Sequence, residues 1–183
     1  MIQQTPSDTD LVRSLRSGSR DAFEELYLRH KDALYDYCSR LLRDDVQAED
    51  VVHDSFLTVW RDASTLNDLG SFRSWMFSVA RHKALNSNRD RKSFDELSED
   101  SMRDDDDPHS IFVRREQAAL LSELLEMIRP AYKDLVLLKD FENFTYAEIA
   151  KITGLSLPSV RIHLFRARKA LAKAYSKKHG EKK

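Results

Sequence analysis

Basic side chains are concentrated near the C-terminus, in a pattern suited to contact with phosphates. Within residues 160–183 a single acid, Glu181, opposes them. The bases are Arg161, Arg166, Arg168, Lys169, Lys173, Lys177, Lys178, Lys182 and Lys183. A cationic helix continued by a cationic tail is the electrostatic footprint expected of a protein that binds a nucleic-acid backbone. This segment is therefore the first candidate for a functional site.

Two amphipathic helices joined by a tight turn, over residues 145–175, must position these side chains. Gly154 stands where a helix end favours positive φ, Ser156 can cap the next helix, and Pro158 is accepted in its first turn. An inward stripe at helical spacing comprises Val160, Leu164, Ala167 and Leu171. The arrangement is typical of a helix-turn-helix, whose second helix lies in the DNA major groove. The alternative is a helical hairpin with a solvated basic face, and the cationic tail favours DNA.

Acidic side chains form a second cluster, which could suggest metal binding or acid–base chemistry. They are Asp44, Asp45, Glu49, Asp50 and Asp54. They precede or begin a predicted helix, where carboxylates are favoured by the helix dipole and are usually solvated. Only His53 joins them at a ligand-like spacing, and the sequence has no Gly-rich phosphate loop, Ser/His/Asp set or activated cysteine. We therefore expect no enzyme activity, no metal site and no cofactor.

The first half of the chain predicts a bundle of four amphipathic helices. Only four glycines and four prolines are present, and β-branched alternation is nearly absent, so the chain is expected to be all-helical. In the third helix Val46 and Trp60 are among the side chains expected to face inward. Four such helices can bury a shared core. They are expected from Ser7 or Asp8 to Gly18, from Asp21 to about Leu42, from about Asp45 to Arg61, and from near Ser71 through Leu85.

In the fourth predicted helix aromatic side chains alternate with basic ones, a combination also found in proteins that bind single-stranded DNA. DNA bases could stack on Phe72 and Trp75, but these side chains equally suit a core. We assign Trp75 to the core because it shares a stripe with Val79. The polar side chains that fit core packing poorly remain candidates for DNA contact: Arg81, His82, Lys83, Asn86, Arg89 and Arg91.

Residues 93–110 differ from the rest of the chain in composition. They are strongly acidic, nearly free of aliphatic side chains, and include Pro108. Such a segment cannot bury enough apolar surface to offset the entropy of ordering, so it is expected to be a flexible linker. Helical periodicity returns over residues 111–128, and Pro130 starts another helix. The sequence thus predicts two small helical domains, 1–92 and 111–183, joined by an acidic linker at 93–110.

The overall composition is compatible with nucleic-acid binding. The formal net charge of −1 is near neutral, but the signs are segregated, so different faces can meet different partners. Cys38 is the only cysteine, which excludes an internal disulfide and predicts a small core residue. No apolar run approaches the ~18 residues of a membrane span, and residues 1–10 lack a signal-peptide pattern. A cytoplasmic protein without membrane insertion is expected.

Three blocks of the sequence carry a family likeness: AEDVVHDSFLTVW at 48–60, FRSWMFSVARHKALNSNRDR at 72–91 and FTYAEIAKITGLSLPSVRIHLFRARKAL at 144–171. In this order they resemble bacterial extracytoplasmic-function (ECF) sigma factors, the small two-domain members of the sigma family of RNA polymerase. The likeness spans residues 17–175. It implies a non-catalytic specificity subunit that binds core RNA polymerase and promoter DNA. The four-helix domain would then be sigma region 2, and the helix-turn-helix domain sigma region 4.

The resemblance also implies three contact sets. A surface for the β′ clamp helices of core polymerase would be formed by Asp50, His53, Asp54 and Phe56. The loop at residues 63–71 would capture a flipped base, and the melted minus-ten strand would be held by Arg81, His82, Lys83, Asn86 and Arg89. The minus-thirty-five major groove would be faced by Arg161, Ile162, Phe165 and Arg166, with phosphate or groove-edge contacts from Tyr146 and Lys139. The acidic linker would thread the polymerase channel.

The chain departs from the family pattern at Ile162, His163 and Asn86, where Ser, Arg and Asp are more frequent. Because Ile162 can touch a thymine methyl group but cannot donate to guanine, we expect a minus-thirty-five preference shifted towards T at that contact. The resemblance further implies an anti-sigma factor as a partner. Two alternatives stay open: a stand-alone helix-turn-helix transcriptional regulator, and a sigma-like decoy that binds a regulator instead of DNA.

Overall fold

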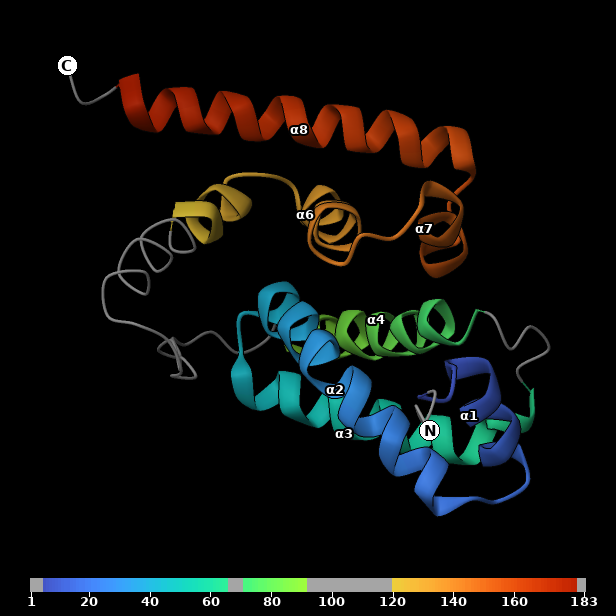
Figure 1. Ribbon diagram of the computed structural model, residues 1–183. Helices are drawn as coiled ribbons and strands as arrows, with labels where there is room; N and C mark the ends of the chain where they lie inside the picture. Colours follow the sequence, from blue (N-terminus) through green and yellow to red (C-terminus); the bar gives the residue numbers. More distant parts are fainter. Residues whose placement is uncertain (1–4, 66–70, 92–119, 181–183) are drawn as a thin grey trace. The chain divides into compact units, whose positions relative to one another are not determined.

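The computed structural model describes residues 5–65, 71–91 and 120–180, and all regular elements in these ranges are helical (Figure 1). The elements are α1 (Asp8–Arg16), α2 (Arg20–Leu42), α3 (Asp45–Asp62), a 3-10 turn (Ala63–Thr65), α4 (Phe72–Arg91), a helix at 120–126, α6 (Pro130–Val136), a π-helical segment (Leu137–Phe141), α7 (Tyr146–Thr153) and α8 (Leu157–Gly180). The predicted all-α fold is confirmed over these ranges. The predicted linker at 93–110 lies outside them, so the domain boundaries stay predictions. Among the helices of these ranges, none combines the length and the apolar character that crossing a bilayer requires.

Side-chain caps determine where the first helices begin. Each cap accepts a hydrogen bond from a backbone N–H that the helix itself leaves unpaired. Ser19 is such a cap, which is why α2 begins at Arg20 and not at the predicted Asp21. Positive φ follows the first two helices: Gly18 (85°) lies just after the C-cap of α1, and Arg43 (57°) is the C-cap of α2. The caps are Ser7 on the N–H of Asp10 (3.2 Å), Ser19 on the N–H of Ala22 (3.2 Å) and Asp44 on the N–H of Gln47 (2.9 Å).

The first compact unit contains α1 to α4, with α2 in contact with each of the other three helices. Its core includes Cys38, as predicted, and the side chains of Leu26, Leu34, Tyr37, Met76 and Phe77. Trp75 is half-buried beside the fully buried Phe72, at a ring-centroid distance of 6.3 Å. Trp75 therefore lies at the edge of the core to which we assigned it.

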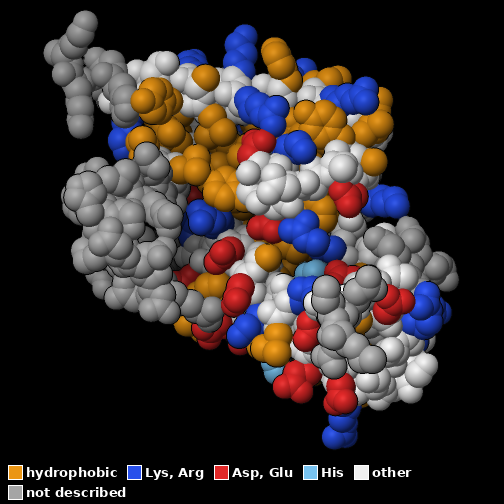
Figure 2. All heavy atoms as spheres, viewed as in Figure 1, with side chains coloured by type: hydrophobic (Ala, Val, Ile, Leu, Met, Phe, Trp, Pro, Cys, Tyr) orange, Lys and Arg blue, Asp and Glu red, His pale blue; other side chains and the backbone are white. Residues whose placement is uncertain are grey.

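Two side chains of α3 expected in the core are on the surface instead. Val46 is 69% exposed and Trp60 is 42% exposed. The buried side of α3 is set by Ala48, Ser55 and Val59, and helical periodicity turns Val46 away from it. Trp60 lies at the margin, with one edge against Phe23 at a ring-centroid distance of 5.2 Å. Figure 2 shows hydrophobic side chains reaching the surface between charged ones.

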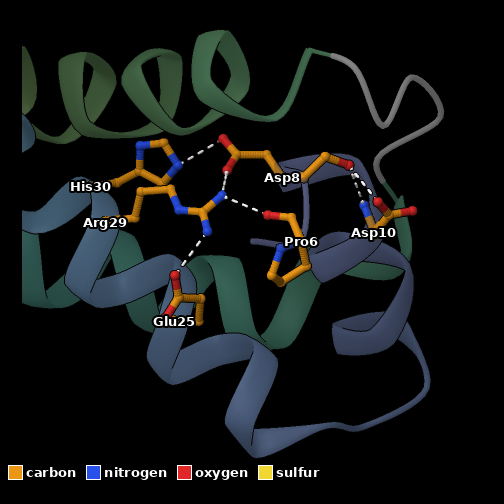
Figure 3. A network of polar contacts seen from close by, with 7 residues as sticks. Pro6, Asp8, Asp10, Glu25, Arg29 and His30 are labelled. Carbon is orange, nitrogen blue, oxygen red and sulfur yellow. Dashed lines mark hydrogen bonds and ion pairs between the residues drawn. The ribbon is translucent and has the colours of Figure 1, made fainter. Parts of the chain in front are cut away.

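A polar network ties α1 to α2 (Figure 3). One carboxylate oxygen of Asp8 lies 2.8 Å from His30 Nε2, and the other accepts a hydrogen bond from Arg29 at 2.8 Å. Arg29 also donates to Glu25 (2.8 Å) and to the carbonyl oxygen of Pro6 (3.1 Å). Burial lowers the pKa of His30, and the nearby Asp8 carboxylate opposes this shift only in part. His30 is thus held as a buried hydrogen-bonding group.

The second compact unit contains α6 and α8, which pack against each other. Buried Lys133 of α6 forms an ion pair with Glu126 (2.5 Å), which joins α6 to the helix at 120–126. The inward side of α8 includes Val160, Leu164 and Ala167, all of which are buried as predicted. The hydrophobic stripe of α8 therefore supplies one wall of this core.

The predicted helix-turn-helix is confirmed in α7 and α8. Thr145 and Glu148 form a capping box at the start of α7, because each accepts a hydrogen bond from the backbone N–H of the other. Gly154 has the expected positive φ of 74°. Ser156 then accepts a hydrogen bond from the N–H of Ser159 (3.3 Å), which caps α8.

Candidate DNA and protein interfaces

The outer side of α8 presents all four side chains predicted to face the major groove. Arg161, Ile162, Phe165 and Arg166 are exposed. Exposure reaches 50% for Ile162 and 71% for Phe165, which is high for large apolar side chains. Because the opposite side of α8 is packed, the helix can offer this side to a groove without unfolding. In Figure 2, Lys and Arg side chains stand along α8 with hydrophobic side chains between them.

His163 is positioned differently from its neighbour Ile162. It is half-buried, and its ring lies 6.1 Å from the ring of Tyr132 of α6. His163 therefore faces the packed side of the second unit. Of the two departures in α8, only Ile162 lies where a base edge could be read.

Lys139 and Tyr146, the predicted groove-edge residues, are held together at the base of the helix-turn-helix. Lys139 lies over the ring of Tyr146, 5.5 Å from its centroid, and donates to the carbonyl oxygen of Phe144 (3.0 Å). The π-helical segment carries both Lys139 and Asp140, and π-helical turns are frequent at functional sites. Lys139 and Tyr146 are half-buried, so each packs against the protein and still exposes part of its side chain to solvent.

An ion pair that the sequence did not indicate closes this cluster. Arg168 of α8 donates to Asp140 at 2.6 Å, across a sequence separation of 28 residues. The hydrogen bond that Arg168 donates to Asp140 raises the pKa of Arg168, with a smaller contribution from Tyr146. The pair connects α8 to the π-helical segment.

Helix α4 carries the predicted minus-ten residues. His82 and Asn86 are exposed on its outer side and hydrogen-bonded to each other (2.9 Å). Arg81 and Lys83 are half-buried at the two margins. The side chain of Arg89 lies outside the described residues, and so does the larger part, 66–70, of the loop predicted to capture a base. Four of the five predicted side chains are thus present on one helix.

Helix α3 presents three of the four side chains predicted to contact core polymerase. Asp50, His53 and Asp54 are exposed. Phe56 is only 2% exposed, and its ring packs edge-on against that of Tyr27, 4.8 Å between centroids. Its predicted place on the surface is therefore corrected, because it supports α3 from the core. The Lys83 ammonium lies 3.8 Å from an Asp54 oxygen, which joins the predicted polymerase and minus-ten sets.

Sequence reasoning missed the apolar part of this surface. Leu57 is 51% exposed, on the same side of α3 as Val46 and His53. We define the α3 outer face as the five side chains that recur there at helical spacing: Val46, Asp50, His53, Leu57 and Trp60. That spacing was visible in the sequence, because it lies opposite the stripe of Ala48, Ser55 and Val59. Apolar side chains among charged ones are typical of a surface that binds another protein.

No metal centre accompanies these surfaces in the described ranges. No group of three or more His, Cys, Asp or Glu side chains is placed there to hold a metal ion. Asp44 instead caps α3, Asp45 accepts a hydrogen bond from Ser39, Asp54 and Asp62 pair with Lys83 and Arg61, and Glu49 and Asp50 are exposed.

Comparison with known proteins follows the same division of the chain. Sigma-70 region 2 matches residues 26–94, and Sigma-70, region 4, matches residues 118–171. The RNA polymerase sigma factor YlaC of Bacillus subtilis is 28% identical over 169 residues, covering 90% of this chain and 98% of YlaC. The ECF RNA polymerase sigma factor SigE of Mycolicibacterium smegmatis is 29% identical over 163 residues, covering 86% of this chain and 63% of SigE.

A solved structure shares the fold as well. The sigma factor RpoE of Bartonella quintana, in complex with the anti-sigma factor NepR, superimposes with a TM-score of 0.69 at 19% identity. The alignment covers 84% of this chain and 96% of that one. The two region matches follow one another along the chain, and the two relatives cover 90% and 86% of it. The chain belongs to the ECF group of RNA polymerase sigma factors.

Proposed function

We propose that this protein is an ECF-type transcription initiation factor that binds core RNA polymerase and directs it to specific promoters. The proposal rests on two surfaces in one chain. One is the basic outer side of α8, and the other is the α3 outer face, where exposed apolar side chains lie beside the carboxylates of Asp50 and Asp54. The protein would act in the cytoplasm, without catalytic activity and without a cofactor.

The outer side of α8 would read the minus-thirty-five element in the major groove. Arg166 would make a bidentate contact with guanine, which contributes about 1–3 kcal/mol of discrimination. Ile162 can only make apolar contacts, and the thymine methyl group is the apolar feature of the groove. The expected element therefore combines a guanine with a thymine at neighbouring contacts.

Helix α4 would hold the melted minus-ten strand. His82 and Asn86 offer hydrogen-bonding groups on the exposed side, and Arg81 and Lys83 add positive charge at both margins. Arg89 and the loop at residues 63–71 belong to this proposal through the family resemblance. A single strand suits such a helix because its bases and its backbone are both accessible.

The α3 outer face and neighbouring Asp54 would bind the β′ clamp helices of core polymerase. Leu57 and Trp60 supply apolar contact area, and Asp50 and Asp54 supply charge. In protein interfaces a few buried apolar or aromatic side chains carry most of the affinity, and charges at the rim mainly guide association. We extend the proposal to an anti-sigma partner, because RpoE was solved with one.

Two experiments test the proposed function. The purified chain should co-purify with core polymerase at low salt. The reconstituted holoenzyme should also give run-off transcripts from a promoter selected out of a random library. Failure to bind polymerase, with specific DNA binding retained, would indicate the stand-alone regulator. Failure to bind both would indicate the decoy.

A further inference from the structure

Helix α8 continues past the part of the chain that matches sigma-70 region 4. The match ends at residue 171, whereas α8 runs to Gly180. The additional turns are attached to the rest of the second unit. Ala174 is buried, and Lys178 forms an ion pair with Glu123 of the helix at 120–126. The C-terminal part of α8 is therefore a packed continuation of the recognition helix.

The exposed side of this continuation is a row of lysines. We call Lys169, Lys173 and Lys177 the lysine stripe. Together with Ile162 and Arg166 they follow one another at intervals of four, three, four and four residues, which places all five on one side of α8. All five are exposed. The lysine stripe thus prolongs, without a break, the surface that carries Ile162 and Arg166.

The charges of the lysine stripe are not explained by helix stability. Lysines four residues apart repel each other, and α8 contains no acidic residue to offset them. The helix dipole favours cations only in the last turn, which does not account for Lys169 or Lys173. A row of cations along a rigid helix suits a partner that carries regularly spaced negative charges, and the DNA backbone is such a partner.

We propose that the lysine stripe binds backbone phosphates at the rim of the minus-thirty-five major groove. The inference rests on the proposed function, because α8 must first lie in that groove. The N-terminal residues of a recognition helix contact base edges. Lys177 lies about 16 Å beyond Arg166 along the helix axis. The major groove is about 12 Å wide, so the later turns of α8 pass over the phosphates that bound it. These contacts add affinity that does not depend on base sequence.

The test compares neighbouring lysines on opposite sides of α8 in the full-length protein. The double variant K173Q/K177Q removes two charges from the stripe, and K178Q removes one charge that faces Glu123. Each is reconstituted with core polymerase, and binding to the selected promoter is measured as a function of salt. The slope of log affinity against log salt concentration should become less negative by about 1.8 when two phosphate contacts are lost. Between about 50 and 200 mM salt this corresponds to a roughly 12-fold smaller loss of affinity than for the wild type. K178Q should leave the slope within error of the wild type.

Neutral methylphosphonates at the rim of the groove provide the second measurement. They should weaken binding of the wild type more than binding of K173Q/K177Q, which keeps only Lys169 of the stripe. Equal slopes for K173Q/K177Q and the wild type would overturn the inference while leaving the proposed function intact. An equal effect of K178Q would also overturn it, since the side of the helix would then be irrelevant. Weaker binding of K173Q/K177Q to polymerase, with unchanged methylphosphonate sensitivity, would assign the stripe to a protein partner. A wild-type protein that forms no promoter complex with polymerase would overturn the proposed function and this inference together.

Discussion

The α3 outer face and the outer side of α8 share one unusual property and differ in another. Both expose large apolar side chains, Leu57 and Trp60 on α3 and Ile162 and Phe165 on α8. Around them the charges have opposite signs, because α3 carries Asp50 and Asp54 whereas α8 carries only bases. Apolar exposure therefore marks both surfaces as binding sites, and the sign of the surrounding charge selects the partner. This comparison predicts that substitutions on one surface spare the function of the other.

The largest effect is expected from L57D on α3. A carboxylate at this position would be desolvated without a partner in the polymerase complex, and disruption at the centre of an interface costs at least about 2 kcal/mol. Polymerase affinity should fall by about 30-fold or more, as measured by titration of labelled protein with core enzyme. DNA binding by the free chain should not change. M127D is a matched control, because Met127 is equally exposed at 51% but lies in the second unit. Equal losses for both variants would show that the α3 outer face is not the site.

R166A tests the opposite surface. Loss of an arginine contact to guanine should reduce promoter affinity by about 1–3 kcal/mol, and only for promoters that carry that guanine. Holoenzyme footprints on the selected promoter and on one with the guanine replaced would show this. Polymerase binding should equal that of the wild type. An unchanged footprint would remove Arg166 from the recognition surface, and weakened polymerase binding would contradict the comparison itself.

Local chemistry explains why the sequence predicted α8 better than α3. Gly154, Ser156 and Pro158 act within a few residues of their own position, so the turn and the cap could be inferred without a tertiary structure. Which side of α3 is buried depends instead on where α2 and α4 pack. Val46 and Trp60 were therefore placed inward on hydrophobicity alone, and their exposure corrects this.

The polar cluster at the base of the helix-turn-helix was beyond prediction for a related reason. Arg168 pairs with Asp140 across 28 residues, and Asp140 lies in a π-helical segment that changes the register of the chain after α6. A change of hydrogen-bond register from four to five residues has no clear signal in hydrophobic periodicity. Lys139 and Tyr146 are expected as phosphate or groove-edge contacts only through the family resemblance. Their contact with DNA stays a prediction.

The free energy of unfolding of the first unit should depend on pH, because this unit contains the buried His30. Burial lowers the pKa of His30 below its ordinary value of 6.5, so the unfolded chain takes up the proton first as pH falls. The stabilisation from neutral His30 is present above pH 6.5 and is lost as pH falls through the lower pKa of the folded state. Chemical denaturation from pH 8 to 5, followed by Trp60 and Trp75 fluorescence, would measure this loss.

Two variants separate the contributions to this network. H30Q should remove the pH-dependent part of the free energy of unfolding. If this free energy changed with pH as steeply in H30Q as in the wild type, His30 would be excluded as the source. D8N keeps the shape of the side chain but weakens charged hydrogen bonds to Arg29 and His30, at a cost of about 1–2 kcal/mol. Both tryptophans lie in the first unit and therefore report its unfolding. D10N is the control, because it neutralises a carboxylate on the exposed side of the same helix, α1.

Ile162 should contribute less than Arg166, because its contact is apolar. Burying one methyl group against it is worth about 0.8 kcal/mol, which is a roughly fourfold preference for T at that position. Selection of holoenzyme-bound promoters from a random library should show T enriched, and I162S should abolish the enrichment. Lack of T enrichment with the wild type would contradict this reading of α8, while polymerase binding would not be affected.

The smallest effect is expected where the two kinds of surface meet. Asp54 lies 3.8 Å from Lys83, and its side chain is 62% exposed, so solvent screens the pair and its energy is small. D54A should weaken polymerase binding by about 0.5 kcal/mol, or roughly twofold. It should not weaken binding of the free chain to a minus-ten single strand, because Lys83 then has no carboxylate competing for its charge. D50A, farther from Lys83 along α3, should weaken polymerase binding without altering strand binding. If D54A instead weakened strand binding, Asp54 would be needed to position Lys83, and the protein-binding and DNA-binding surfaces would be coupled at this pair.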